Sequence, residues 1–559
     1  MNDSTAPRRQ VSWSEWRFVA LGAAAILFVT TLPYIYAYLL APPDKQFMGI
    51  MLDVPDHAQY FSWMRELSQA PLAANKLTPE PNEPIFFNLL WWGLGRTGRL
   101  LGLNYEWNFQ LLRIVGGILF LFVIYRMIAW FMDDIFQRRV AFILIALSSG
   151  FGWILIVMKY TLLKGELLFP SLVYIAEGNS FLGILGYPHF IAAALYIFIF
   201  YLVLRGQMHG KLGYAVSAGL LALFLGWQHA YDLILVWGVL GAYTLTSWIR
   251  DREAPVYLIQ SLIIIVIVSF IPALYSVLLT SMDPLWKEVL AQFVNADINT
   301  PNPIGLVVLL GLIFLLAIYT SLRQNPLKLA SWDNRKLFIN TWFWTNFLLV
   351  YIPVNFQIHL INGWQVPIGI LATQGAFDYV IPWLTSVFDR IHITPKKFDT
   401  RTIVACILIL VVLPTNIYLW AWRFVDLARH DYPYYLSKED LNALLWLENN
   451  IQAEDVVLSS ITLGQYIPVM TGGHAFLAHW AQTLDYFEKE RIVQTFFAST
   501  TSEAWRQEIL HQYSVDYIYY GSVEQEIGSF VSEEKVDYLR PVLDGSEVTV
   551  YRVIVDNEG

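Results

Sequence analysis

The sequence predicts a mainly α-helical, polytopic membrane protein of about 11 transmembrane helices with a small extracytoplasmic C-terminal α/β domain. Two observations carry this prediction. The 559 residues are 56% hydrophobic and only 14% charged, whereas soluble domains carry about 25% charged residues. Apolar runs of roughly 20 residues, the length of one transmembrane helix, recur up to residue 424, and the remainder is far more polar. We therefore expect a membrane domain, residues 1–424, and a soluble domain, residues 425–559.

The apolar runs give eleven predicted spans, the third, fifth and sixth of which are interrupted by glycine and polar residues. They are residues 16–40, 109–131, 140–158, 188–205, 212–228, 231–249, 255–279, 303–322, 337–354, 366–388 and 402–424. The first span is followed by no small-residue cleavage site, so we expect it to be uncleaved.

Loop charge predicts the orientation in the cytoplasmic membrane. With a cytoplasmic N-terminus, every short inner loop holds at least two Lys or Arg residues, whereas the outer loops around 228–232 and 355–365 hold none. This agrees with the positive-inside rule. The prediction places loop 41–108 and the C-terminal domain outside the cytoplasm.

Several function classes lack support in the sequence. The net charge is −9 and no Lys/Arg-rich block is present, so nucleic acid is not an expected partner. Cys406 is the single cysteine and lies in an apolar run, which excludes a disulfide framework and a thiolate metal site. No Walker or dinucleotide-binding fingerprint occurs.

The polar tail has the pattern of an α/β domain. Residues 437–440 resemble the N-terminal box of a helix that continues to 449. The tail's predicted strands are residues 455–458, 516–520 and 547–555, and its predicted helices are residues 484–498 and 502–513.

The most informative stretch follows the first span, where Asp53, Asp56 and His57 lie within five positions. Pro55 suits the first turn of a helix, so we expect Asp53 on the loop and Asp56 in that first turn. Tyr60 then shares a helix face with Asp56. Acidic groups at a helix N-terminus also have a purely structural explanation, because the helix dipole favours them.

Polar residues at the edges of other spans are further candidates, because ionisable groups there are costly. In the predicted topology they lie at the outer end. They are Arg113, Glu177, His189, His229, Asp232, Gln357 and His359. Structural alternatives remain open: Glu177 can be a solvated turn residue, the His229–Asp232 pair can hold its turn together, and Arg113 can snorkel.

An outer-face site with paired carboxylates suits general-base activation of a hydroxyl acceptor. Asp56 is the expected base and Asp53 assists it, while His57, Tyr60 and the span-edge candidates line the substrate pocket. A lipid phosphate would be the leaving group, stabilised by Arg or His. The sequence identifies no cofactor, and a divalent cation (Mg or Mn) on the second carboxylate remains open.

These features resemble the GT-C superfamily of membrane glycosyltransferases. The resemblance rests on the many spans, the outer tail, Asp56-His57-Ala58-Gln59-Tyr60 in the first outer loop, Glu177 before Pro188-His189, and His229-Ala230-Tyr231-Asp232. It implies an Asp base, a polyprenyl-phosphate-linked sugar donor, inversion at the anomeric carbon, and a glycan, lipid or protein acceptor.

The chain departs from the superfamily pattern in two ways. Either Asp53 or Asp56 can match the superfamily carboxylate, and we favour Asp56. The oligosaccharyltransferase signature Trp-Trp-Asp-Tyr-Gly is absent, so N-glycosylation of protein is not implied. A secondary transporter and a non-catalytic membrane subunit are the alternatives, although no internal repeat supports a transporter.

Overall fold

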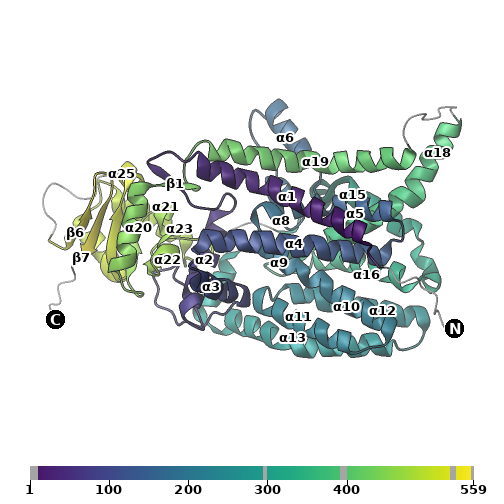
Figure 1. Ribbon diagram of the computed structural model, residues 1–559. Helices are drawn as coiled ribbons and strands as arrows, with labels where there is room; N and C mark the ends of the chain where they lie inside the picture. Colours follow the sequence, from purple (N-terminus) through teal and green to yellow (C-terminus); the bar gives the residue numbers. More distant parts are fainter. Residues whose placement is uncertain (1–9, 294–298, 391–398, 529–536, 555–559) are drawn as a thin grey trace. The chain divides into compact units, whose positions relative to one another are not determined.

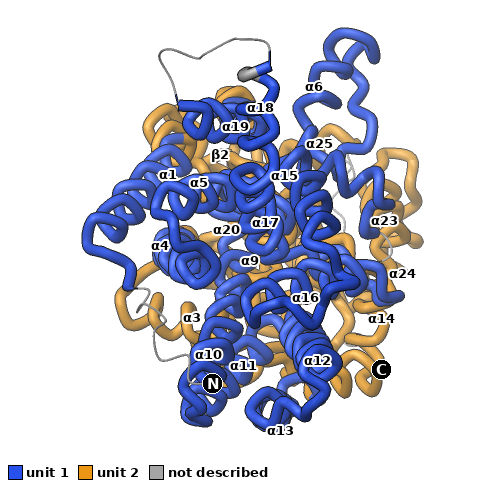
Figure 2. The backbone as a smooth tube through the Cα atoms, turned by 90° about the vertical axis from the view of Figure 1, so that its right-hand side faces the viewer, with its two compact units in different colours: residues 1–32, 111–274, 298–423 blue, residues 33–110, 275–297, 424–559 orange. Residues whose placement is uncertain are grey.

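The computed structural model describes residues 10–293, 299–390, 399–528 and 537–554. The chain forms two compact units, coloured separately in Figure 2. Unit 1 contains residues 1–32, 111–274 and 298–423, and unit 2 contains residues 33–110, 275–297 and 424–559. The C-terminal tail therefore belongs to the same unit as most of the loop that follows the first span.

Unit 1 is helical, and α1, α4, α13 and α19 each have residues in both units. The helices of unit 1 are α1 (Trp13–Leu39), α4 (Tyr105–Phe131), α5 (Ile135–Ala146), α6 (Gly152–Thr161), α7 (Ser171–Tyr174), α8 (Ser180–Gly186), α9 (Pro188–Ala193), η1 (Ala194–Tyr196), α10 (Ile197–His209), α11 (Gly213–Gln228), α12 (Asp232–Asp251), α13 (Val256–Met282), α15 (Pro303–Arg323), η3 (Pro326–Ser331), α16 (Asn334–Leu349), η4 (Gln357–Ile361), α17 (Gln365–Gly375), η5 (Ala376–Val380), α18 (Ile381–Arg390) and α19 (Thr400–Leu427).

Seven helices in the described part of the chain are long and apolar enough to cross a membrane, so the chain is an integral multi-pass membrane protein. They are α1, α4, the continuous segment Pro188–His209, α12, α13, α15 and α19. Each coincides with a predicted span.

The other four of the eleven predicted spans form shorter or divided helices. Span 140–158 is split because α5 ends before Ser148 and α6 starts at Gly152, and the Ser149 hydroxyl donates to the Val412 carbonyl oxygen (2.5 Å). Serine side chains that bond to backbone groups compete with helix continuation. Helices α11 and α16 have 16 residues each, and α17 passes through a π-helical segment into α18. The predicted count of eleven is therefore not reproduced by helix length.

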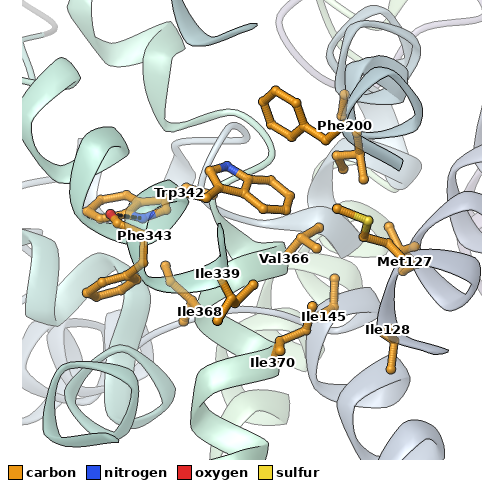
Figure 3. Packing of buried hydrophobic residues seen from close by; sticks show 14 of the residues in the cluster. Met127, Ile128, Ile145, Phe200, Ile339, Trp342, Phe343, Val366, Ile368 and Ile370 are labelled. Atoms are coloured by element: carbon orange, nitrogen blue, oxygen red, sulfur yellow. Dashed lines mark hydrogen bonds between the residues drawn. The ribbon is translucent and has the colours of Figure 1, made fainter. Parts of the chain in front are cut away.

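Unit 1 has a continuous apolar core. Figure 3 shows Trp342 and Phe343 of α16 with Ile145 of α5 and Ile370 of α17 in that core. Phe200 of α10 packs edge-on against the Trp342 ring at 5.0 Å between ring centroids. Large side chains from helices far apart in sequence thus meet in one cluster.

Unit 2 contains helices and a small mixed sheet (Figure 1). Its elements are β1 (Lys45–Phe47), α2 (Val54–Gln69), α3 (Leu89–Leu101), α14 (Pro284–Gln292), β2 (Tyr435–Ser437), α20 (Lys438–Asn450), β3 (Val456–Leu458), α21 (Ile461–Gly464), α22 (Ile467–Met470), β4 (His474–Ala475), α23 (Tyr486–Phe497), α24 (Glu503–Gln512), β5 (Val515–Tyr520), α25 (Ser522–Ile527), β6 (Leu539–Asp544) and β7 (Thr549–Val553). The three predicted strands and two predicted helices of the tail are confirmed as β3, β5, β7, α23 and α24.

The sheet has the strand order β4-β3-β5-β7-β6, with β3 parallel to β4 and β5 and the remaining pairs antiparallel. Ser437 and Asp440 form the capping box that the sequence predicted at the start of α20.

The loop after the first span is built into the tail. Strand β1 pairs antiparallel with β2, and the backbone N–H of Ala475 in β4 donates to the Lys76 carbonyl oxygen (2.9 Å). Helix α2 contacts α3 and α22. The first turn of α2, which carries Asp56, therefore rests on a framework that includes the tail.

Candidate functional site

The two early aspartates have different surroundings. Asp53 is the N-cap residue of α2, with a left-handed backbone (φ 46°) and an exposed side chain. Asp tolerates this conformation better than most residues. Asp56 lies in the first helical turn, as predicted, and its side chain is 26% exposed.

The Asp56 carboxylate is held through one of its two oxygens. His479 Nε2 lies 2.9 Å from Asp56 Oδ1, and Trp480 Nε1 donates to the same oxygen at 3.2 Å. No hydrogen bond from the described residues reaches Oδ2. One oxygen is thus occupied by two N–H donors while the other remains available to a substrate.

Backbone contacts determine the tautomer of His479. Its Nδ1 accepts hydrogen bonds from the backbone N–H groups of Ala481 (3.0 Å) and Gln482 (3.2 Å). A ring nitrogen that accepts carries no proton, so the proton of the neutral ring is on Nε2 and is donated to Asp56. His479 is 1% exposed.

The loop that carries His479 is fixed by a buried hydroxyl and two amide side chains. Thr483 Oγ1 accepts from the backbone N–H groups of Ala478 (3.0 Å) and His479 (3.1 Å) and donates to the Leu77 carbonyl oxygen (2.6 Å). The side-chain amides of Asn75 and Gln292 donate to further carbonyl oxygens of the loop (2.9 Å each). The His479 donor is therefore held in a defined position.

Opposing effects act on the protonation of Asp56. Burial would raise the pKa of this carboxyl, but the hydrogen bond from His479, the electrostatic influence of the His479 and His57 rings and the Trp480 N–H outweigh burial. The pKa therefore lies below its ordinary value, and Asp56 is ionised at neutral pH.

The other two candidates on α2 make contacts that support the helix. His57 is fully buried, with Nδ1 2.8 Å from the Asp53 carbonyl oxygen and its ring edge-on to Phe109 (5.1 Å between centroids). The half-buried Tyr60 ring stacks on Trp91 at 4.8 Å and 14°. A substrate role for either side chain stays a prediction.

A second polar cluster, in unit 1, contains four of the predicted residues in two carboxylate–imidazole pairs. Glu177 Oε1 lies 2.5 Å from His359 Nδ1. Asp232, which is fully buried, places Oδ2 2.8 Å from His229 Nδ1. The Glu177 side chain is 7% exposed, whereas that of His359 is 22% exposed. We call these four residues the carboxylate–imidazole cluster.

Tyr231 connects the two pairs. Its hydroxyl hydrogen-bonds to His229 Nε2, and its ring stacks on His359 at 5.1 Å and 23°. The Gln365 side chain donates to the Glu177 carbonyl oxygen and so orients the other pair. Residues 177, 229, 232 and 359, distant in sequence, are thereby brought together, and both imidazoles offer Nδ1 to a carboxylate.

The remaining predicted residues lie near this cluster or elsewhere in unit 1. The His189 ring is 6.5 Å from the His229 ring. The side-chain amide of Gln357 donates from Nε2 to Asn299 Oδ1 at 3.4 Å. Arg113 is buried and donates to the hydroxyls of Thr30 (3.1 Å) and Thr31 (2.7 Å), which gives it a structural role in its helix pair.

The sequence analysis missed His479, Trp480 and Gln365. The available signal for the first two was a His-Trp pair directly after the apolar run 475–478 of a polar tail. Among the described residues, no group of three or more His, Cys, Asp or Glu side chains is placed to hold a metal ion.

Comparison with known proteins extends the fold assignment. No protein-family model and no curated protein matches the chain. The oligosaccharyltransferase AglB from Archaeoglobus fulgidus, in complex with an inhibitory peptide and a dolichol-phosphate, matches with a TM-score of 0.52 at 14% identity, over 92% of this chain and 70% of that chain. The arabinofuranosyltransferase AftD from Mycobacteria matches with a TM-score of 0.53 at 12% identity, over 97% of this chain and 40% of that chain.

A further structure of the Archaeoglobus fulgidus oligosaccharyltransferase, tethered with an acceptor peptide containing the NVT sequon, has a TM-score of 0.53 at 14% identity and covers 89% of this chain and 69% of that chain. The chain therefore has a GT-C-like fold, as its sequence predicted. Similarity at this level of identity concerns the fold, and the reaction has to be argued from the residues.

Proposed function

We propose that the protein is a membrane glycosyltransferase that moves a sugar from a polyprenyl-phosphate donor to a hydroxyl-bearing lipid, glycan or protein acceptor. The observation that carries this proposal is the Asp56 carboxylate, which is ionised, partly exposed and held through one oxygen so that the other faces no described donor. A general base needs this combination of charge, access and fixed direction.

The proposed step is a single displacement. Asp56 Oδ2 accepts the proton of the acceptor hydroxyl while the hydroxyl oxygen forms a bond to the anomeric carbon. The bond between that carbon and the phosphate oxygen breaks, and the polyprenyl phosphate leaves with the electron pair. One displacement inverts the anomeric configuration.

Separately from the Asp56 step, the carboxylate–imidazole cluster of unit 1 is proposed as a binding site for a lipid phosphate. A carboxylate on Nδ1 orients the imidazole, and charge-assisted hydrogen bonds from imidazoles can stabilise negative charge on phosphate. His359, the more exposed of the two imidazoles, is the proposed direct contact. The dolichol-phosphate described with AglB, a protein of similar fold, is consistent with a lipid phosphate as ligand.

Two further points belong to the proposal. A divalent cation, Mg or Mn, has Asp56 Oδ2 available as a ligand, and no step above is assigned to it. The basic inner loops support an active site on the outer face of the cytoplasmic membrane.

The test compares two isosteric variants of the purified protein in liposomes that contain polyprenyl-phosphate-linked pentoses and hexoses and a membrane glycolipid extract as acceptor. Asp56→Asn keeps the side-chain shape but removes the base, so transfer is expected to be abolished. Asp53→Asn retains a residue that tolerates the left-handed backbone, and because Asp53 is expected only to assist the base, this variant is expected to keep part of the transfer activity. Unchanged turnover in the folded Asp56→Asn variant would refute the assignment.

A further inference from the structure

We propose that His479, supplied by the C-terminal tail, is the positioning residue of Asp56 and selects Oδ2 as the oxygen that takes the proton. This inference rests on the proposed function and adds a role for the tail in the reaction. It is carried by the geometry of one carboxylate oxygen, one imidazole and the loop that holds the imidazole.

The two oxygens of the Asp56 carboxylate have different hydrogen-bond partners. Two N–H donors already lie at Oδ1, at 2.9 Å from His479 and 3.2 Å from Trp480. A proton on Oδ1 would point toward groups that donate and do not accept. Proton transfer is therefore directed to Oδ2, which accepts no hydrogen bond from the described residues.

The orientation of the His479 ring is fixed by its second nitrogen. Because Nδ1 is engaged by the backbone N–H groups of Ala481 and Gln482, the ring cannot turn over and present Nδ1 to Asp56 without losing both bonds. The imidazole is thereby a permanent Nε2–H donor toward Asp56. A role as alternating acid and base would require proton exchange at both ring nitrogens. The hydrogen bonds at Nδ1 do not suit that role.

The loop that carries His479 is held at several points. The loop that carries His479 is bonded by side chains from three different segments of unit 2: Asn75 of the first loop, Gln292 of α14 and Thr483 of the tail itself. Phe293 adds an edge-on contact with the Trp480 ring (5.4 Å). A loop held at so many points can fix a carboxylate, whereas a mobile loop could not.

Loss of the His479 donor has two expected consequences. The carboxylate keeps only the weaker Trp480 hydrogen bond at Oδ1 and can shift, and displacement of a catalytic group by about 1 Å costs on the order of a hundredfold in rate. Burial continues to act on Asp56 while its strongest donor is gone, so the pKa of Asp56 rises. The charged or titratable groups that act on this carboxyl are His479 and His57.

The experiment uses three variants of the full-length protein. His479→Ala removes the donor, His479→Gln restores a side-chain N–H near the position of Nε2, and His511→Ala is the control because His511 is an exposed imidazole of the tail. We measure kcat and KM for a polyprenyl-phosphate-linked sugar across pH. In parallel, carbodiimide labelling of Asp56, quantified by peptide mass spectrometry across pH, reports the protonated carboxyl without requiring turnover.

The expected result is a roughly hundredfold lower kcat for His479→Ala with KM little changed. The acid limb of the rate profile and the onset of Asp56 labelling both move to higher pH. His479→Gln recovers most of the rate, and His511→Ala matches the wild type.

The proposal is overturned if His479→Ala keeps the wild-type rate and labelling profile, or if folded His479→Gln is as impaired as His479→Ala. These outcomes differ from a failure of the proposed function, in which Asp56→Asn itself would retain turnover.

Discussion

Substitution of Thr483 by Val tests whether one buried hydroxyl holds the loop that carries His479. Thr483 is fully buried, and its hydroxyl serves two backbone N–H groups and one carbonyl oxygen. Val has nearly the same shape but cannot bond, so three buried polar groups lose their partner. At about 1 kcal/mol each, the low end for buried unsatisfied groups, the loop loses about 3 kcal/mol of local stability. This corresponds to roughly a 150-fold change in a local opening equilibrium.

Hydrogen–deuterium exchange of the peptide that spans residues 475–486 measures this opening. The amides of Ala478 and His479 are expected to exchange roughly 150-fold faster in Thr483→Val than in the wild type. Thr483→Ser keeps the hydroxyl and serves as the matched control, with protection close to the wild type. If Thr483→Val kept full protection at these two amides, the hydroxyl would not be what holds the loop.

Two further predictions concern other buried polar groups. Glu177→Gln removes the charge that holds His359, so KM for the lipid-linked donor is expected to rise at least about tenfold. The control is Glu166→Gln, because Glu166 is exposed and its substitution is expected to leave KM unchanged. Equal KM values for the two variants would exclude Glu177 from donor binding. Burial, and then the Lys76 ammonium, lower the pKa of His474 from 6.5. Below about pH 6.5 the unfolded chain therefore binds more protons than the folded chain. The free energy of unfolding falls as the pH drops below this value, by at most about 1.4 kcal/mol per pH unit. His474→Gln is expected to flatten this fall in thermal unfolding, and an unchanged slope would contradict it.

The predictions that succeeded rest on local patterns. Pro55 placed Asp56 in the first turn of α2, and the polar tetrapeptide 229–232 marked a turn between two helices. The strands and helices of the tail followed from the period of apolar residues over short windows. Each of these features depends on residues within a few positions of one another.

The contacts that the sequence did not predict join segments far apart in the chain. Asp56 and His479 are 423 residues apart, and Glu177 and His359 are 182 apart. No periodicity or capping rule reaches across such separations, so the sequence predicts a separate soluble domain for the tail and indicates no site residue within it. The divided helices at 140–158 and 366–388 were missed for the same reason, because tertiary contacts such as that of Ser149 with Val412 compete with helix continuation.

Release of the lipid carrier distinguishes sugar transfer from sugar transport. Purified protein in liposomes is supplied with a membrane glycolipid extract as acceptor and with a polyprenyl-phosphate-linked sugar labelled in both parts, and free polyprenyl phosphate and transferred sugar are quantified. We expect the two products in equal amounts with the wild type and neither product with Asp56→Asn. Movement of intact sugar across the membrane without release of polyprenyl phosphate would contradict this expectation and favour a transporter.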